Sequence, residues 1–340
     1  MKVSVFVPAH ITGFFSILEN INPLKKGSCG AGILIDKGVV TTIKTKQKSL
    51  DDEKNSENHV KENHINITIN GKNDPKNETI SHETISLMKK ALSLEIDYDI
   101  SINHDIQVPI GAGFGTSASC GLGTAIGLSK LLKLSLSTTE AEQFAHIAEI
   151  NLGSGLGDVL SQTSKGIVIR KFPGAPGIGK VKNITLTENK TQSYDNDNNS
   201  NNNDNKDNKE KNNINENNPF SDTYVLTKTF GEIDTSSIIK NPFYVKKINK
   251  IGIAMQKKII ATPTIENFMK CSYEFSKNTN LMNEELQSLI EELNKKTIGA
   301  SMAMLGNTVF TIVKMENIDD IEDLSQFTIS KIYNDGIKVI

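Results

Sequence analysis

The stretch VPIGAGFGTSASCGLGTAIGLSKLL, residues 108–132, decides how the rest of the chain is interpreted. A short apolar run leads into Gly111, Gly113 and Gly115, and a long run of small and apolar residues follows them. Glycines let a backbone turn sharply, and the free N–H groups at the start of a helix attract anions. The pattern predicts a strand, a glycine loop and a helix from residue 116, arranged as a phosphate-binding site. The alternative is a glycine-rich turn that only packs.

Hydroxyl groups stand where this helix is predicted to begin. Thr116, Ser117 and Ser119 add hydrogen-bond donors, and one of them could be a magnesium ligand. The familiar phosphate motifs do not fit. The chain has no GxxxxGK[ST] P-loop, no acidic residue at the spacing of a dinucleotide fingerprint, and no protein-kinase HRD and DFG pair. The predicted phosphate site is therefore of another kind.

A helix with candidate chemical groups is predicted downstream. Residues 137–140, STTE, fit a capping box, which predicts a helix that runs to Asn151. His146 and Glu149 are three apart, so they project from one face of this helix. Helical His and Glu side chains are more often solvated or satisfied within a core, and that alternative stays open.

A glycine-rich connector, NLGSGLG at 151–157, ends in Asp158. Its glycines would let Asp158 approach Glu149 without steric penalty. Residues 166–170, GIVIR, predict a strand that ends in Arg170. A guanidinium suits a bidentate carboxylate contact, although a surface ion pair is an equal alternative for this residue.

The remaining patterns predict a mixture of strands and helices. Residues 8–15 are expected to be a loop where chemistry could sit, and residues 36–38 and 334–336 look like hairpin turns. Residues 299–310 look like a second small-residue turn before a strand. Strands are expected at 3–7, 32–35, 39–45, 65–69, 98–106, 224–230, 327–332 and 336–340, and helices at 79–94, 264–277 and 283–296.

The composition argues against several functional classes. Of the 340 residues 37% are hydrophobic and 23% charged, and the formal charge is −2. Nucleic acid and anionic membranes attract proteins with an excess of positive charge, which this chain lacks, so neither is an expected partner. Cys29, Cys120 and Cys271 have no metal-ligand spacing and are odd in number, so neither a zinc site nor a disulfide framework is expected. Without a signal-peptide or membrane-length apolar run, a cytoplasmic protein is the expectation.

Two polar segments look like insertions. In residues 188–218, 14 of the 31 residues are Asn, and only Tyr194 and Ile214 could pack. Such a segment cannot bury enough apolar area to offset its ordering entropy. Residues 47–63 have the same character. The remaining 292 residues suit one two-lobed enzyme rather than a chain with an extra domain.

Taken together, the motifs resemble those of the GHMP small-molecule kinases. PIGAGFGTSAS at 109–119 resembles their central ATP-binding motif, PAHITG at 8–13 lies where their first motif lies, and GASMAMLGNTVF at 299–310 where their third lies. Order and spacing agree over essentially the whole chain outside the insertions. Ala9 stands where Gly is common in the first motif, and Thr116 where many members have Ser. Neither departure threatens the kinase assignment.

Four further segments resemble one archaeal branch of this superfamily, whose members phosphorylate pantoate: PAHITGFF, KKGSCGAG, HIAEINLGSGLGD and GIVIR. The resemblance implies a ribosomal-protein-S5-like N-terminal lobe over residues 1–172 and a ferredoxin-like C-terminal lobe over residues 173–340. ATP and substrate would lie between the lobes. The implied reaction is ATP-dependent phosphorylation of the 4-hydroxyl of (R)-pantoate, an early step of archaeal coenzyme A synthesis, by a homodimer.

The resemblance also implies a role for each matching residue. Asp158 would lie beside the transferred group, and Ser117 and Glu149 would hold Mg²⁺ and the phosphates. Apart from the resemblance, the chemistry of phosphoryl transfer makes Asp158 a candidate general base, and Lys25 or Lys26 could screen phosphate charge or be ordinary loop charges. The implied ATP contacts are Pro109, Gly111, Gly113, Phe114, Gly115, Thr116, Ser117, Ala118, Ser119 and Glu149, and the implied pantoate contacts are His10, Ser28, His146 and Arg170.

Three rival functions remain. The first is phosphorylation of another small alcohol, such as mevalonate or homoserine. A non-catalytic nucleotide-binding sensor or scaffold is a second rival, against which the joint presence of Ser117, Glu149 and Asp158 argues. A nicotinamide-binding dehydrogenase is the third.

Overall fold

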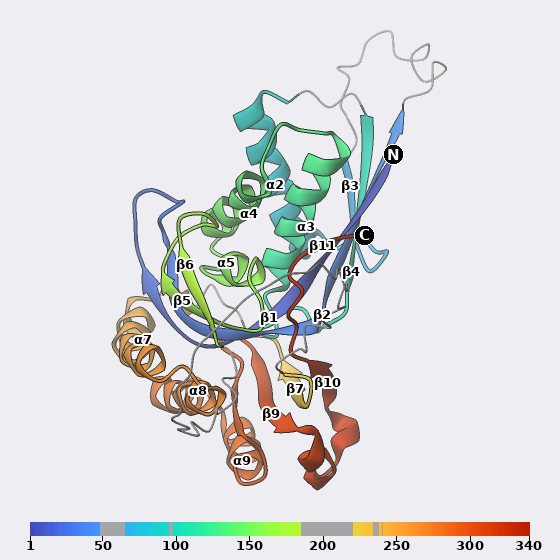
Figure 1. Ribbon diagram of the computed structural model, residues 1–340. Helices are drawn as coiled ribbons and strands as arrows, with labels where there is room; N and C mark the ends of the chain where they lie inside the picture. The colour runs from blue at the N-terminus through green and yellow to red at the C-terminus, as the bar shows by residue number, and fades with distance from the viewer. Residues whose placement is uncertain (48–64, 95–97, 185–219, 234–237, 240) are drawn as a thin grey trace, which may run out of the picture.

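The protein consists of two packed lobes (Figure 1). The computed structural model describes residues 1–47, 65–94, 98–184, 220–233, 238–239 and 241–340. Apart from Gln47, the two predicted insertions lie outside the described residues. Within the described residues, one lobe is built on a seven-stranded sheet and the other on a four-stranded sheet. The two-lobed α+β architecture is the one that the sequence predicts.

The larger sheet is dominated by two long antiparallel strands, β1 (Lys2–Leu18) and β2 (Gly27–Gln47). They pair from end to end, with Lys2 opposite Lys44 and Leu18 opposite Gly27. The sheet order is β11-β1-β2-β4-β3, and β5 pairs with the first half of β2 and with β6. These further strands are β3 (Ile65–Ile69), β4 (Tyr98–Ile106), β5 (Ile167–Phe172), β6 (Lys180–Ile184) and β11 (Lys338–Val339).

The predicted loop at residues 8–15 and the predicted turn at residues 36–38 are both wrong. β1 runs straight through the expected loop at residues 8–15, and β2 runs through the expected hairpin turn at 36–38. Pro8 lies opposite Gly38 beside a β-bulge, where a missing N–H disturbs the ladder least. Glycine is required at position 38 because a Cβ there would overlap the carbonyl oxygen of Val7. These residues mark irregularities in long strands and not chain reversals.

Helices cover one face of this sheet (Figure 1). Helix α3 lies so close to β2 that a Cβ at Gly123 would overlap the hydroxyl of Thr41, as the small residues of α3 predict. The predicted capping box of α4 is present, with the Ser137 hydroxyl accepting from the Glu140 amide and the Glu140 carboxylate accepting from the Ser137 amide. The helices are α2 (Pro75–Leu92), α3 (Thr116–Leu131), α4 (Thr138–Leu152) and α5 (Asp158–Gln162).

The smaller sheet has the order β10-β7-β9-β8. Its strands are β7 (Thr223–Gly231), β8 (Gly299–Met302), β9 (Asn307–Lys314) and β10 (Thr328–Lys331). Helices α7 (Pro242–Ala261), α8 (Ile265–Thr279) and α9 (Glu284–Leu293) come between β7 and β8, and two 3-10 turns, Met315–Asp320 and Leu324–Gln326, come between β9 and β10. This strand order is that of the ferredoxin-like arrangement that the resemblance implies, but 3-10 turns stand where that arrangement has its second helix.

Helix α7 has no counterpart among the predicted elements, and it joins the two lobes. It lies on β1 so closely that a Cβ at Gly252 would overlap the carbonyl oxygen of Phe15. Helix α8 lies on the same strand, where the Phe14 and Phe275 rings are 6.4 Å apart. Buried apolar residues from the second half of β1, α7, α8 and the smaller sheet belong to one apolar cluster. Packing against β1 therefore stabilises α7, and this packing is a tertiary contact.

The end of the chain also differs from the prediction. Residues 334–336 do not join a hairpin, because β10 pairs with β7 in one sheet and β11 pairs with β1 in the other. The larger sheet likewise passes the expected lobe boundary at residue 172, since β6 pairs with β5. Among the described residues, no helix has the length and apolar character needed to cross a membrane.

A buried polar network ties β2, β4, α2 and α3 together. The two ring nitrogens of His104 lie 2.8 Å from the hydroxyls of Thr41 and Ser81, and Thr124 donates to Ser81 at 3.0 Å. Burial lowers the pKa of His104 to about 4. The neutral ring can therefore donate through one nitrogen and accept through the other.

Neutral His104 makes folding sensitive to acid. The unfolded chain protonates this group near its ordinary pKa of 6.5, so the unfolded state binds more protons as the pH falls below that value. Stability is then lost progressively between the unfolded and folded pKa values. Between about pH 7 and pH 4.5, we expect the unfolding free energy of the wild type to fall by about 2 kcal/mol more than that of His104→Gln. Urea denaturation at the two pH values measures the difference. An unchanged pH dependence would refute this role.

Candidate active site

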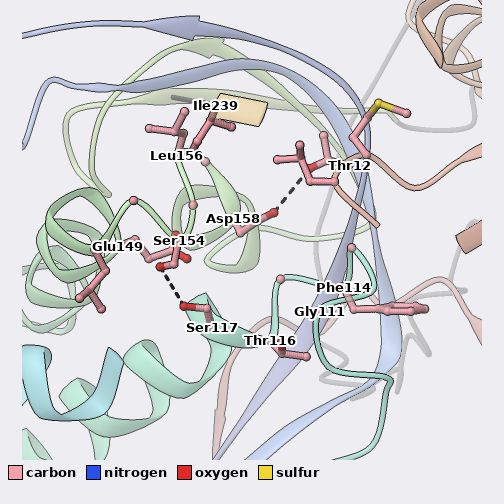
Figure 2. A pocket seen from close by; sticks show the side chains of 18 of the residues that line it. Thr12, Gly111, Phe114, Thr116, Ser117, Glu149, Ser154, Leu156, Asp158 and Ile239 are labelled. Atoms are coloured by element: carbon pink, nitrogen blue, oxygen red, sulfur yellow. Dashed lines mark hydrogen bonds between the residues drawn. The ribbon is translucent and has the colours of Figure 1, made fainter. Parts of the chain in front are cut away.

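A cavity of about 490 Å³ opens where the start of α3 meets β1, the α4–α5 connector and the turn between β8 and β9 (Figure 2). It is lined by residues from both lobes, including Gly113 and Ser117 from the first and Met304 and Leu305 from the second. Deep sites with a few convergent polar groups are the usual places for small-molecule binding.

The glycine loop has the geometry expected of an anion site. Gly111, Gly113 and Gly115 have φ values of 71°, 87° and 64°, in the left-handed region that favours glycine. Gly115 is the N-cap of α3, and no side chain caps this helix. Its first N–H groups and the positive end of its dipole thus remain available to a ligand in the cavity. The predicted loop and helix from residue 116 are confirmed.

The turn between β8 and β9 supports the glycine loop from the second lobe. A Cβ at Gly306 would overlap the carbonyl group of Ala112, so the two backbones are in direct contact. The Met304 amide donates to the Thr12 carbonyl at 2.8 Å, which fixes the same turn to β1. On the other side, Gln162 donates to the carbonyl of Gly115 at 3.1 Å. The loop is therefore in contact with the second lobe on one side and with α5 on the other.

Ser117 and Glu149 lie together on one side of the cavity (Figure 2). The Ser117 hydroxyl donates to Ser154 at 3.0 Å. Glu149 is buried against Gly155, and burial, followed by the negative charge of Asp158, raises its pKa well above the usual value. Among the described residues no group of three acidic, His or Cys side chains could hold a metal ion by itself.

Asp158 is the first residue of α5 and faces the cavity. Its Oδ1 accepts a 2.6 Å hydrogen bond from Nδ1 of His10. The same oxygen accepts a longer one, 3.5 Å, from the Thr12 hydroxyl (Figure 2). Burial raises the pKa of Asp158, but the His10 hydrogen bond, the charge of Arg170 and the Thr12 bond outweigh burial and leave it below the usual value. Two neighbouring carboxyls thus differ, because Asp158 is the ionised one and burial holds Glu149 towards neutrality.

Arg170 is buried, at 1% exposure, and the surface ion pair considered from the sequence is wrong. Its Nη1 donates to the Ser161 hydroxyl at 2.7 Å, and its Nε has no partner among the described residues. A Cβ at Gly157 would overlap the Ser28 hydroxyl and lie 2.8 Å from Nε of Arg170. Glycine at 157 therefore leaves the space in which Ser28 and Arg170 face the cavity.

Most of the predicted site residues meet at this cavity. Those that line it are Ser28, Gly111, Gly113, Phe114, Gly115, Thr116, Ser117, Glu149, Asp158 and Arg170. Those that do not are His10, Pro109, Ala118, Ser119 and His146. Lys26 forms an ion pair with Glu19 at 2.8 Å, as an ordinary loop charge would, and neither Lys25 nor Lys26 lines the cavity.

The predicted substrate contact of His146 needs correction. Its Nε2 lies 3.1 Å from the carbonyl oxygens of both Pro23 and Lys26, and the ring is buried. The Glu149 side chain faces the cavity, whereas His146 holds the loop that leads into Ser28. Sequence spacing places both residues on a similar helical face, but it does not reveal which one a crossing loop covers.

Some lining residues were not predicted. Thr12, Ser154 and Leu156 stand within segments that the sequence motifs single out, yet nothing in their type marks them as functional. Glu232 reaches the cavity from the smaller sheet and pairs with Lys76 at 3.3 Å. No local signal predicts it, because it comes close only when the two lobes pack.

Comparison with known proteins agrees with this geometry. Residues 80–166 match the family model described as the N-terminal domain of GHMP kinases. The chain is 37% identical over 317 residues to a pantoate kinase of Methanocaldococcus jannaschii, covering 93% of this chain and 94% of the relative. It is 28% identical over 345 residues to a pantoate kinase of Thermococcus kodakarensis, covering 100% and 98%. A solved structure described as a phosphotransferase related to the coenzyme A biosynthesis pathway superposes with a TM-score of 0.78 at 27% identity, covering 100% of this chain and 99% of that one.

Fold and site together define a kinase that acts on a small molecule. The chain belongs to the pantoate kinase family of the GHMP kinases. Membership in the GHMP kinases implies ATP as the phosphate donor.

The contact between the lobes predicts a selective effect on the nucleotide. Gly306→Ala places a methyl group against the Ala112 carbonyl and pushes the glycine loop out of position. We expect the KM for ATP to rise by about tenfold or more, measured by steady-state kinetics. Gly71→Ala is the control. It also strains a glycine, since φ is 75°, but an added Cβ there would meet no atom within 4 Å and Gly71 does not line the cavity. Equal ATP affinity in both variants would contradict this role of the turn.

Proposed function

We propose that this protein transfers the γ-phosphoryl group of ATP to the 4-hydroxyl of (R)-pantoate, which yields (R)-4-phosphopantoate and ADP for coenzyme A synthesis in archaea. The relatives from Methanocaldococcus and Thermococcus are pantoate kinases. The observation within this chain that carries the proposal is the buried guanidinium of Arg170, which faces the same cavity as Asp158 and the glycine loop.

The phosphates of ATP would occupy the glycine loop and the start of α3. The free amides of this helix terminus and the hydroxyls of Thr116 and Ser117 would bind the phosphate oxygens. Pro109, Ala118 and Ser119 would then shape the loop and helix from behind. On this proposal, the residues that line the cavity contact the nucleotide, and the residues behind them support those contacts.

Ser117 and Glu149 fit a magnesium site. A buried carboxyl whose pKa is raised by burial and by a nearby negative charge regains its charge when a cation is beside it. Mg²⁺ usually takes only one or two protein ligands and completes its shell with water and phosphate oxygens, so a larger acidic cluster is unnecessary. When bound, Mg²⁺ would neutralise the charge that develops on the β and γ phosphates.

The other end of the cavity suits pantoate. Its carboxylate would meet the guanidinium of Arg170, whose Nε otherwise has no partner among the described residues, and a hydroxyl would meet Ser28. Pantoate also carries two methyl groups on C3. Phe15, Leu156 and Ile239 line the cavity and supply apolar surface for them. Homoserine has no such methyl groups, and mevalonate has only one.

Asp158 would act as the general base. Its lowered pKa keeps it ionised near neutral pH, so it can accept the proton of the 4-hydroxyl as that oxygen bonds to the γ-phosphorus and the bond to ADP breaks. The assembly of the protein is also a proposal, namely the homodimer that the resemblance implies.

The substrate assignment is tested by ADP release with pantoate, pantothenate, mevalonate and homoserine. We expect kcat/KM for pantoate to exceed the others by about 100-fold or more. If kcat/KM is clearly higher for mevalonate or homoserine, pantoate is not the substrate. ATP binding without turnover on any alcohol would favour a non-catalytic nucleotide-binding protein.

Arg170→Ala tests the proposed carboxylate contact. We expect the KM for pantoate to rise by about tenfold or more while the KM for ATP changes by less than about threefold. Arg170→Lys is the matched control, since it retains the charge but not the planar fork and should lose less. A rise in the KM for ATP with an unchanged KM for pantoate would reject the contact.

Asp158→Asn tests the base. The variant keeps the size of the side chain but removes its basicity, and we expect kcat to fall by about 100-fold or more. Asp335→Asn, at an exposed residue outside the cavity, is the control and should retain the wild-type kcat. A loss of less than about tenfold in folded Asp158→Asn would rule out general-base catalysis by this residue.

A further inference from the structure

His10 lies behind Asp158 and not in the cavity. The ring is completely buried, at 0% exposure, on β1, and it is absent from the cavity lining that includes Asp158. Its Nδ1 is 2.6 Å from Oδ1 of Asp158. A substrate in the cavity therefore reaches the Asp158 carboxylate before it could reach the His10 ring.

Backbone contacts fix the position of this ring. The His10 amide donates to the Phe114 carbonyl at 3.0 Å, which ties β1 to the glycine loop. On the other side, a Cβ at Gly32 of β2 would overlap Nε2 of His10. Glycine at position 32 is thus the cradle into which the imidazole fits, and the ring cannot tilt away from Asp158 without leaving that cradle.

The hydrogen bonds determine which nitrogen carries the proton. An ionised Asp158 is only an acceptor, so Nδ1 of His10 must be the donor. Nε2 is buried and has no partner among the described residues. A protonated Nε2 would be an unsatisfied buried donor, whereas an unprotonated Nε2 leaves only an unpaired acceptor, which proteins tolerate more often. Burial, moreover, is the largest effect on the His10 pKa and lowers it below the usual value.

We propose that His10 is a positioning residue that acts through Asp158, and not a substrate contact. Its Nδ1–H holds Oδ1 of Asp158 and so fixes the rotamer of the carboxylate, while Oδ2, to which no described residue donates, is left to accept the proton of the substrate hydroxyl. Thr12 adds a weaker second bond to the same Oδ1. This assignment replaces the direct pantoate contact expected of His10 from the sequence, and it rests on the proposed role of Asp158 as the base.

Two amide substitutions distinguish the two ring nitrogens. In His10→Asn the side-chain NH₂ can occupy the position of Nδ1 and donate to Asp158, whereas in His10→Gln it reaches towards the position of Nε2 and Gly32. We expect His10→Asn to keep kcat within about fivefold of the wild type and His10→Gln to lose about 30-fold or more, with both KM values within about threefold. His104→Gln, which alters another buried histidine away from the cavity, should keep the wild-type kcat and serves as the control for packing effects.

Two kinetic outcomes would overturn the proposal. Equal kcat values for the Asn and Gln variants would show that the position of the donor is irrelevant. A pantoate KM raised by about tenfold at unchanged kcat would make His10 the substrate contact that the sequence first indicated.

A spectroscopic test does not depend on the substrate. In a long-range ¹H–¹⁵N spectrum of ¹⁵N-histidine-labelled wild-type protein, we expect His10, identified by its loss in His10→Asn, to be neutral with its proton on Nδ1. Asp158→Asn should shift the His10 Nδ1 signal, and Asp335→Asn should not. A proton on Nε2, or a His10 signal indifferent to Asp158→Asn, would overturn the proposal even if the enzyme phosphorylates pantoate. The expected spectrum would uphold the hydrogen bond even if pantoate proves to be the wrong substrate.

Discussion

The continuous pairing of β1 with β2 is the constraint on which the rest of the structure depends. Both lobes pack on these two strands, with the helices of the first lobe on one face and α7 and α8 on the other (Figure 1). The strands also bring Thr12 from β1 and Ser28 from β2 into the cavity lining, and they place His10 of β1 behind Asp158 and beside the glycine loop. Because packed antiparallel strands cannot slide by one residue without turning every side chain over, the register of this pair fixes these groups together.

Near β1 and β2, two carboxyl groups of the site have different surroundings. Glu149 is buried on α4 beside another negative charge, so it fits the place of a cation, while Asp158 has a donor and a guanidinium near it and stays ionised. The glycine loop is in backbone contact with the second lobe, so the proposed nucleotide site depends on how the lobes pack. Such fixed polar groups need little rearrangement when charge develops during phosphoryl transfer.

The sequence alone predicts much of this because some signals are local. The three glycines, the small residues of α3 and the Ser137 capping box act within a few residues, and each is confirmed. The failures share a different cause. Pro8 and Gly38 look like turns in sequence but serve a bulge and a close approach between strands, and the role of His146 depends on a loop that crosses its helix. Motif resemblance singles out His10 as a substrate contact, whereas its burial and its hydrogen bond to Asp158 support the proposal that it acts through a neighbour.

The central claim is that β1 contributes to chemistry through the contact between His10 and Asp158. A double-mutant cycle with His10→Gln and Asp158→Asn, read as kcat in folded protein, tests it most directly. If His10 acts only by positioning the Asp158 carboxylate, the double variant will be no slower than Asp158→Asn alone, because the group being positioned is already lost. Independent losses that multiply in the double variant would contradict the claim and assign His10 a separate role in the reaction.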